Sequence, residues 1–417
     1  MELGIMNISG RYLLIFLMII ASLVGCQESQ PTRFKLLNPQ VSGINFSNDL
    51  VDTEDENILE YLYYYNGGGI AVGDINNDGL EDIYLSGNQV PDQLYLNLGG
   101  LKFKNITSRL NFPDDPHWST GVTMADVNLD GCLDIYVCQV GNYKKFKGTN
   151  KLFINNKDGT FSEKAQAYGL DFSGYSTQSV FFDYDKDGDL DLFLLTHAAH
   201  FTRSFSPAET RHTRDSLAGD YLFKNRLNEG KLGFEDVSVT VGILGATQGY
   251  GLAVMVSDIN GDNWPDLYVG NDFHEDDYLY INQRDGTFKE RLKEILPHTS
   301  RFTMGVDIQD LNGDTKPEIF TVDMLPYERE IRLKSAFEDS EKIATIKESY
   351  GYQKQFARNN LHLNLGDEHF GDVALMTGLE ATDWSWSVLI DDFDNNSIPD
   401  IFITNGIFKR GNDLDYM

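Results

Sequence analysis

Short apolar runs recur along this chain, and glycine, asparagine or aspartate flanks each of them. One run enters an acidic stretch, as in IAVGD and SVFFD, and a second leaves it, as in DIYLSG and DLFLLT. A third run follows in each unit, such as QLYLNL, and after a short turn a fourth, such as KFKNIT. β-Branched and aromatic residues dominate these runs, which is typical of strands. Four strands per unit, repeated at about 50 residues, predict an all-β fold of β-propeller blades rather than a calcium solenoid, whose nonapeptide spacing is absent.

The acidic stretch between the first two runs follows the pattern D-x-N-x-D-G-x-x-D, whose side-chain oxygens fall at positions 1, 3, 5 and 9. We number its copies as acidic loops one to six. Their oxygen-bearing residues are Asp74, Asn76, Asp78 and Asp82; Asp126, Asn128, Asp130 and Asp134; Asp183, Asp185, Asp187 and Asp191; Asp258, Asn260, Asp262 and Asp266; Asp310, Asn312, Asp314 and Glu318; and Asp392, Asp394, Asn396 and Asp400.

These residue types in this spacing favour calcium, which prefers six to eight hard oxygen ligands. Alternate residues of a tight loop can direct their side chains at one centre, and Gly79 suits a bend with positive φ. An EF-hand is excluded because it needs a bidentate Glu at position 12, where loop one has Leu85 within an apolar run. A single such motif usually marks only a turn, but six copies between strand-like runs predict calcium loops.

Insertions collect in one part of each unit. The first loop residue is 23, 29, 42, 24 and 54 residues from the Asn that ends the third run, in units one to five. The remainder of each unit varies only from 28 to 33 residues. In an antiparallel blade the 2–3 connection lies at the opposite end from the 1–2 loop. We therefore expect variable, ligand-binding insertions on the face opposite the calcium loops.

Two insertions are long. Residues 196–219 form a locally basic island, with His197, His200 and His212 and with Arg203, Arg211 and Arg214. The arginines form a candidate ligand face for an acidic partner, or they pair with the protein's own acids. The histidines could hold a transition metal, although loop-stabilising roles are favoured. In the second insertion, residues 328–350 predict a helix packed on the propeller.

The N-terminus is predicted to be a lipoprotein signal peptide, residues 1–25, followed by a tether, residues 26–33. Residues 12–24 are uncharged and apolar, and Arg11 precedes them. The run ends Leu23-Val24-Gly25-Cys26, so Cys26 is the candidate lipidation site; a soluble secreted protein is the alternative. Cys132 and Cys138 are expected to lie on one strand, about 20 Å apart and so unable to pair, as buried free thiols.

The propeller is assigned to residues 34–417. Residues 34–46 resemble the fourth-strand segments, so they are expected to supply the outer strand of the last blade. After residues 400–403 no third run follows, so the sequence predicts five complete blades and a shortened sixth.

The chain is acidic, with 64 acidic and 34 basic residues and a formal charge of −30. Nineteen of the 64 acids are proposed ligands, and six Ca²⁺ would change the formal charge from −30 to −18. Nucleic acid is excluded as a partner because the sequence shows no basic stripe to meet phosphates.

These repeats resemble the FG-GAP/VCBS calcium propellers, which include the integrin α head and cartilage acidic protein. The resemblance extends from residue 34 to residue 417 and is closest to bacterial surface lipoproteins associated with an ASPIC/UnbV domain. Further support comes from the stretches DMLP, RNNL, TDWSWS and TNGI, at residues 323–326, 358–361, 382–387 and 404–407. The resemblance implies a seven-bladed calcium propeller.

Loops five and six depart from the pattern. Thr315 and Ser397 replace the loop Gly, and Asn396 replaces an Asp. Because Thr resists positive φ, these two loops are expected to bind calcium weakly or to be structural.

The sequence therefore favours a non-catalytic binding or adhesion module, lipid-anchored at the bacterial cell envelope, with a protein or glycan ligand. A calcium-dependent polysaccharide lyase or hydrolase on the same scaffold is the main alternative, since fold alone does not decide function. A structural component of an outer-membrane assembly is the third.

Overall fold

The computed structural model describes residues 34–112, 117–199, 205–335, 339–408, 410 and 412–415. The predicted signal peptide and tether, Cys26, His200 and Arg203 lie outside the described residues. The chain divides into two units, Met1–Asn38 and Pro39–Met417. All described helices and strands belong to the second unit.

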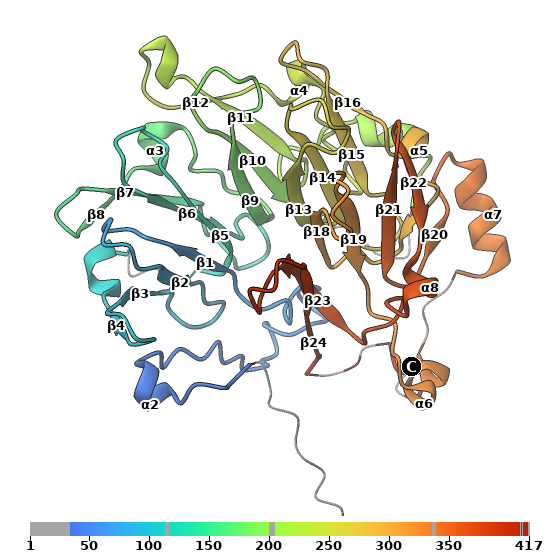
Figure 1. The fold of residues 1–417 in the computed structure, drawn as a ribbon, viewed down its shortest axis with the longest axis horizontal. Helices are drawn as coiled ribbons and strands as arrows, with labels where there is room; N and C mark the ends of the chain where they lie inside the picture. The colour runs from blue at the N-terminus through green and yellow to red at the C-terminus, as the bar shows by residue number, and fades with distance from the viewer. Residues whose placement is uncertain are drawn as a thin grey trace, which may run out of the picture. The chain divides into compact units, whose positions relative to one another are not determined.

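Within Pro39–Met417 the described strands form five four-stranded antiparallel sheets and one two-stranded sheet, each in sequence order (Figure 1). Two further short strands pair in parallel outside these sheets. Blade one contains β1 (Ile70–Gly73), β2 (Asp82–Leu85), β3 (Gln93–Asn97) and β4 (Phe103–Asn105). Blade two contains β5 (Ser119–Ala125), β6 (Asp134–Gln139), β7 (Lys151–Asn155) and β8 (Phe161–Glu163). Blade three contains β9 (Ser176–Phe182), β10 (Asp191–Thr196), β11 (Tyr221–Asn225) and β12 (Phe234–Asp236).

The remaining blades follow the same plan. Blade four contains β13 (Gly251–Ser257), β14 (Asp266–Asn271), β15 (Tyr278–Asn282) and β16 (Phe288–Glu290). Blade five contains β18 (Gly305–Gln309), β19 (Glu318–Val322), β21 (Asn360–Gly366) and β22 (His369–Asp372). The last sheet contains β23 (Ser385–Asp391) and β24 (Asp400–Asn405). The predicted all-β blade plan, with five complete blades and a shortened sixth, is confirmed.

Apolar side chains fill the space between neighbouring blades. The first strands of successive blades lie next to one another, from β1 and β5 through to β18 and β23. Tyr84 and Leu94 of blade one pack with Ile135 and Phe153 of blade two, and all four are fully buried. The second strands are buried along their whole length in blades two to five, as their continuous apolar sequences require. Each blade therefore shares its core with the next.

A short helical turn follows each fourth strand: η1 (Thr107–Leu110), α3 (Ala165–Tyr168), α4 (Ser238–Val241), α5 (Leu292–Ile295) and α8 (Ala374–Thr377). Gly242, which ends α4, lies so close to the next blade that a Cβ there would be 2.5 Å from the Phe288 carbonyl oxygen. Helix α2 (Pro39–Ser42) is followed by Gly43, and a Cβ at Gly43 would likewise be 2.2 Å from the Phe103 carbonyl oxygen of blade one. Residues 39–43 thus match the repeat, but residues 34–38 form no strand, which differs from the predicted outer strand.

The 2–3 connections lie at the end of the sheets opposite the acidic loops, as predicted, because the strand order is antiparallel throughout. They carry η2 (Ala208–His212) in blade three, and α6 (Arg329–Lys334), α7 (Glu341–Ser349) and β20 (Gln355–Phe356) in blade five. Strand β20 pairs with β17 (Thr299–Ser300). The single helix predicted over residues 328–350 is two helices instead. Turn η3 (Leu227–Glu229) lies at the other end, between the last two strands of blade three.

Cys132 and Cys138 are both free thiols, as predicted. They do not share a strand, however, because Cys132 lies in acidic loop two and only Cys138 lies on β6. Cys138 is buried and Cys132 is only half-buried. A search of the described residues for a helix long and apolar enough to cross a bilayer finds none.

Candidate metal centres

The six acidic loops share one backbone conformation, set by the aspartate at position 1. In loop one the Asp74 carboxylate accepts the N–H of Asp78 at 3.1 Å and the N–H of Gly79 at 2.7 Å. In loop six Asp392 accepts the corresponding N–H groups of Asn396 and Ser397 at 2.9 and 2.6 Å. The four loops between them contain the same pair of bonds. The first carboxylate therefore holds each loop closed around the other three oxygen-bearing side chains.

Positions 4 and 6 are left-handed in all six loops, with φ between 55° and 95°. Position 6 is glycine in loops one to three but Asn263, Thr315 and Ser397 in loops four to six. Thr315 adopts φ 71° and Ser397 φ 67°. Both residues thus adopt a conformation that costs roughly 1–2 kcal/mol of strain per residue, and the expectation that loops five and six bind calcium weakly or are structural stays a prediction.

The acid at position 9 is buried in loops one to five, at the start of the second strand. Asp134 illustrates its contacts: one oxygen accepts the N–H of Val127, at position 2 of its own loop, and the other accepts the N–H of Asn155, at the end of the third strand. Burial raises the pKa of Asp134 and Asp266 to about 7 and that of Asp191 to about 8, partly offset by these N–H donors. Because burial disfavours the ionised form of these carboxyl groups, a cation nearby would stabilise their negative charge.

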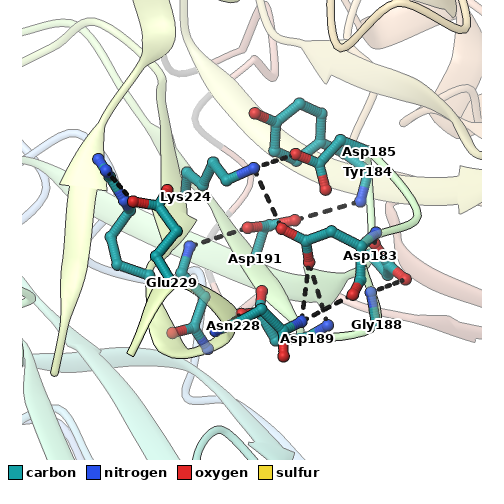
Figure 2. Close-up of polar contacts among 12 residues, drawn as sticks. Asp183, Tyr184, Asp185, Gly188, Asp189, Asp191, Lys224, Asn228 and Glu229 are labelled. Carbon is teal, nitrogen blue, oxygen red and sulfur yellow. Dashed lines mark hydrogen bonds and ion pairs between the residues drawn. The ribbon is translucent and has the colours of Figure 1, made fainter. Parts of the chain in front are cut away.

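Loop three is one of two loops that bring three carboxylates close together (Figure 2). Oxygens of Asp183, Asp185 and Asp187 all lie within 4.8 Å of one another. The Lys224 ammonium, from the third strand of the same blade, pairs with Asp185 and lies 3.1 Å from an Asp187 oxygen. Burial alone would lower the pKa of Lys224, but its hydrogen bonds to these two aspartates raise it. A cation of the protein itself thus occupies the neighbourhood of the position 3 and 5 ligands.

Loop six forms the second such group, with oxygens of Asp392, Asp394 and Asp400 within the same 4.8 Å. The sequence ranked loop six among the weaker sites, yet its acids come together as closely as those of loop three. Loops one, two, four and five combine an Asn with three acids at the four ligand positions.

The donor set fits calcium. Every ligand-position side chain offers oxygen, the charge is strongly negative, and the loop backbone directs alternate side chains inward. Within loop three, one oxygen of Asp185 and one of the fully buried Asp189 have no hydrogen-bond partner. The Lys224 ammonium places a positive charge beside Asp185, where a metal ion would place one.

Arg211 and Arg214 of the blade-three insertion do not form an exposed ligand face, and Arg203 lies outside the described residues. Arg211 is buried, and its guanidinium lies 2.8 Å from a Glu275 oxygen and 3.1 Å from an Asp276 oxygen of blade four. Arg214 donates to the Asp220 carbonyl oxygen and lies over the Tyr221 ring. The physical reason is that a buried carboxylate needs a partner, and the nearest available cation is in the neighbouring insertion. This outcome corresponds to the alternative in which the arginines pair with the protein's own acids.

Arg211 belongs to a larger junction between insertions. Asp276 also accepts the N–H of Gln353 from blade five, at 2.9 Å. The Tyr352 hydroxyl donates to the Ser206 carbonyl oxygen of blade three at 2.7 Å. We call Arg211, Glu275, Asp276, Tyr352 and Gln353 the insertion junction, because they join blades three, four and five into one surface.

The histidine prediction is resolved for two of three residues. His197 is buried, and burial lowers its pKa to about 4; in the neutral ring Nδ1 donates to the Ala198 carbonyl oxygen at 2.9 Å and Nε2 accepts from the Tyr61 hydroxyl at 3.1 Å. Its ring packs against an aromatic cluster that includes Tyr63 and Tyr175. His212 is exposed. The contacts of His197 therefore stabilise the start of the insertion, which agrees with the favoured loop-stabilising role.

Sequence reasoning missed several residues of these centres. Lys224 stands where the other third strands have Leu96, Ile154, Ile281 and Leu363, and aligning the repeats would have exposed it. Asp189, at position 7 of loop three, was not singled out either. The asparagine that ends each third strand served only as a spacing marker, although it contacts the loops directly.

Comparison with known proteins agrees with this geometry. The family model described as FG-GAP-like repeat matches residues 74–137, 140–194 and 258–321, and two of these matches begin at position 1 of an acidic loop. Cartilage acidic protein 1 of Xenopus tropicalis is 25% identical over 245 residues, which cover 57% of this chain and 33% of that protein. Integrin alpha-3 of Cricetulus griseus is 25% identical over 162 residues, covering 37% of this chain and 14% of that protein.

The chain therefore spans about a third of the length of the cartilage acidic proteins that it matches. Among solved structures, the V. cholerae biofilm matrix protein Bap1 superposes weakly, with a TM-score of 0.31 and 17% identity over 62% of this chain and 34% of that one. The chain thus contains FG-GAP-like repeats within repeated four-stranded antiparallel sheets, and these findings support an FG-GAP-repeat protein of the propeller type.

Proposed function

We propose that this protein is a calcium-stabilised, non-catalytic binding or adhesion module, held at the bacterial cell envelope by a lipid on Cys26. The observation that carries the proposal is the sixfold recurrence of one oxygen-lined loop at one end of the sheets. Irregular insertions occupy the other end. Repetition suits a structural metal, and variable loops on a rigid scaffold suit recognition.

The side chains at positions 1, 3, 5 and 9 of each loop would hold the ion. Calcium supplies a hard divalent cation that offsets the repulsion among these carboxylates. The chain's own part is to fix the ligands: the position 1 carboxylate closes the loop, and two backbone N–H groups hold the acid at position 9.

The recognition surface is assigned to the insertion face, with a protein or glycan as ligand. The insertion junction and the aromatic cluster around His197 give this face a rigid base. Integrin alpha-3 and cartilage acidic protein 1 are relatives by sequence, and the proposal extends only a non-catalytic binding role to this chain.

The first experiment is thermal unfolding with calcium and with EDTA. An ion that binds only the native state stabilises it by mass action, so chelation should lower Tm and added calcium should restore it. Asp187→Ala removes a carboxylate ligand and Asn396→Ala a neutral one; in calcium we expect the first to cost clearly more stability. An unchanged melting curve in EDTA would refute loaded loops.

The second experiment addresses the ligand and the anchor. A glycan and protein array, read with and without calcium, should give binders that are lost on chelation; release of products from a polysaccharide panel would instead support an enzyme. Cys26→Ser should move the protein from the membrane pellet to the soluble fraction or leave it uncleaved. Wild-type protein that is already soluble would contradict the lipid anchor.

A further inference from the structure

The asparagine that ends the third strand connects neighbouring acidic loops. In its own blade, its backbone N–H donates to the acid at position 9: Asn155 to Asp134, Asn225 to Asp191 and Asn282 to Asp266, each at 2.8 Å. The three asparagine side chains are buried. The third strand is therefore attached directly to a candidate calcium ligand.

The side-chain amide of the same asparagine reaches the preceding blade. The Nδ2 group donates to the carbonyl oxygen at position 2 of the preceding loop: Asn155 to Ile75 at 2.8 Å, Asn225 to Val127 at 3.0 Å, Asn282 to Tyr184 at 2.8 Å and Asn364 to Ile259 at 3.3 Å. The contact recurs at four successive blade junctions. We call Asn155, Asn225, Asn282 and Asn364 the linking asparagines.

The residue at position 2 completes the connection. Its own N–H donates to the acid at position 9 of its loop, as from Tyr184 to Asp191 at 3.3 Å and from Ile259 to Asp266 at 3.0 Å. Hydrogen bonds thus run from Asp191 through Tyr184 and Asn282 to Asp266, and onward through Ile259 to Asn364. The acids at position 9 of successive loops are joined by one repeated, buried path.

We propose that the linking asparagines make calcium binding cooperative between neighbouring loops, an inference that rests on the proposed calcium binding. Position 2 lies between the ligands at positions 1 and 3, so an ion that orders those ligands also orders the carbonyl that the asparagine contacts. The asparagine in turn fixes the acid at position 9 of the next loop, which then loses less freedom when it binds its own ion. Buried hydrogen bonds in series also polarise one another. The linking asparagines are positioning residues, because they act through the ligands.

Loops three and four offer a site-specific test. Trp264 lies at position 7 of loop four, and its fluorescence should report calcium there; Trp264→Phe identifies its share of the signal. We titrate full-length protein with CaCl₂ and compare the loop-four midpoint with loop three intact and with Asp183→Ala. Typical coupling free energies predict that disabling loop three weakens loop four about five-fold or more.

The variant Asn282→Ser removes the amide that links these two loops, so the ratio of midpoints should fall to about one. The matched control is Asn225→Ser, the same change at the junction of loops two and three, which should leave the ratio unchanged. Lys186 of loop three also contacts the Trp264 ring, at 5.0 Å, and offers a competing route. Coupling that persists in Asn282→Ser would therefore overturn the proposal.

Two further outcomes remain distinct. Titration curves without any calcium response would refute calcium binding itself, whereas binding with equal loop-four midpoints in both backgrounds would refute only the coupling. If Asn282→Ser does not fold, Asn155→Ser tests loops one and two by the same scheme. The labelling rate of the half-buried Cys132 thiol, at position 7 of loop two, then reports loop two.

Discussion

The two ends of the blades hold buried carboxylates in different ways. At the insertion junction, Glu275 and Asp276 are buried against the guanidinium of Arg211. At the acidic loops, Asp134 and Asp266 are buried with backbone N–H donors, and burial raises their pKa values. The insertion face therefore carries its own countercharge, whereas the loop face is built to receive one. Stability at the two ends should respond differently to calcium.

Loop three combines both arrangements, because it is an acidic loop that also has a cationic side chain of the protein beside it. It has an acid at all four ligand positions, where loops one, two and four have an asparagine at position 3. Lys224 contacts that additional acid, Asp185, and replaces the leucine or isoleucine of the other blades. The lysine thus offsets the extra charge of its own loop.

The largest effect is expected at the insertion junction. Arg211→Met should lower the free energy of unfolding by about 3–5 kcal/mol, because it removes the guanidinium that pairs with two buried carboxylates; of the two, Asp276 retains the more distant Lys293 ammonium, at 3.7 Å. The loss should be the same with and without calcium, as urea denaturation can measure. Arg284→Met is the matched control: Arg284 pairs with Asp262 at 2.8 Å but is exposed, so it should cost less than about 1 kcal/mol. If calcium restored the stability lost in Arg211→Met, the insertion junction would not be independent of calcium and the contrast between the two ends would be contradicted.

Lys224→Ile should be sensitive to calcium. Without calcium the variant should lose about 2 kcal/mol, since the charged hydrogen bond to the half-buried Asp185 and the ion pair with the exposed Asp187 disappear. With calcium the loss should shrink, and loop three should bind the ion more tightly because the competing ammonium is gone. Adding Asp185→Asn gives blade three the same residues that blade four has at these two positions, an asparagine at position 3 of the loop and an isoleucine in the third strand. The double variant should recover most of the calcium-free stability. A double variant no better than Lys224→Ile would contradict the charge compensation.

The pH dependence separates the two ends further. Burial raises the pKa of Asp191 to about 8 and that of Asp134 to about 7, so the folded, calcium-free protein keeps protons that the unfolded chain has released above about pH 4. Stability without calcium should therefore fall as pH rises from about 4 to about 8. Calcium replaces these protons and should flatten the slope.

Acids at the insertion end provide the internal control for this titration. Burial also raises the pKa of Asp272 to about 8 and that of Asp277 to about 7. Their part of the slope should remain in calcium, because they are not loop residues. Melting temperatures between pH 5 and pH 8, in calcium-stripped and calcium-containing buffer, measure both parts. Slopes that calcium does not change would show that the loop acids are not the groups that bind it.

The smallest effect concerns loop five. Thr315 has φ 71°, a conformation that glycine adopts without strain. Thr315→Gly should stabilise the protein by about 1 kcal/mol, measured by urea denaturation. Thr345→Gly, in helix α7, is the opposite control and should destabilise. If Thr315→Gly also destabilises, the left-handed conformation is not costly there.

The fold was predictable because its information is local and repeated. Period, strand runs and loop spacing all follow from side chains adjacent in sequence, and the positions of the acidic ligands repeat with them. Contacts between distant segments were not predictable. Lys224 and Asp185 are brought together by β-sheet pairing, and Arg211 meets Glu275 only because the blade-three insertion folds against the short 2–3 connection of blade four.

Contacts within the loops explain how Thr315 and Ser397 adopt the left-handed conformation. Their intrinsic preference is unfavourable, but each N–H donates to the carboxylate at position 1, at 2.7 and 2.6 Å, and these bonds fix the turn. Composition left open whether the arginines are exposed or pair with the protein's own acids, because it does not show which charges the fold buries.

The shared backbone of the six loops has an evolutionary consequence. Since positions 4 and 6 remain left-handed with glycine, asparagine, leucine, lysine, threonine or serine, the conformation does not depend on any one of those residues. An Asp and an Asn codon differ by one base, so a blade can gain or lose a charged ligand by a single mutation while its turn stays intact. If the loops bind calcium as proposed, each repeat can lose or regain its ion while its turn stays intact, and the proposed coupling passes part of that change on to the neighbouring loop.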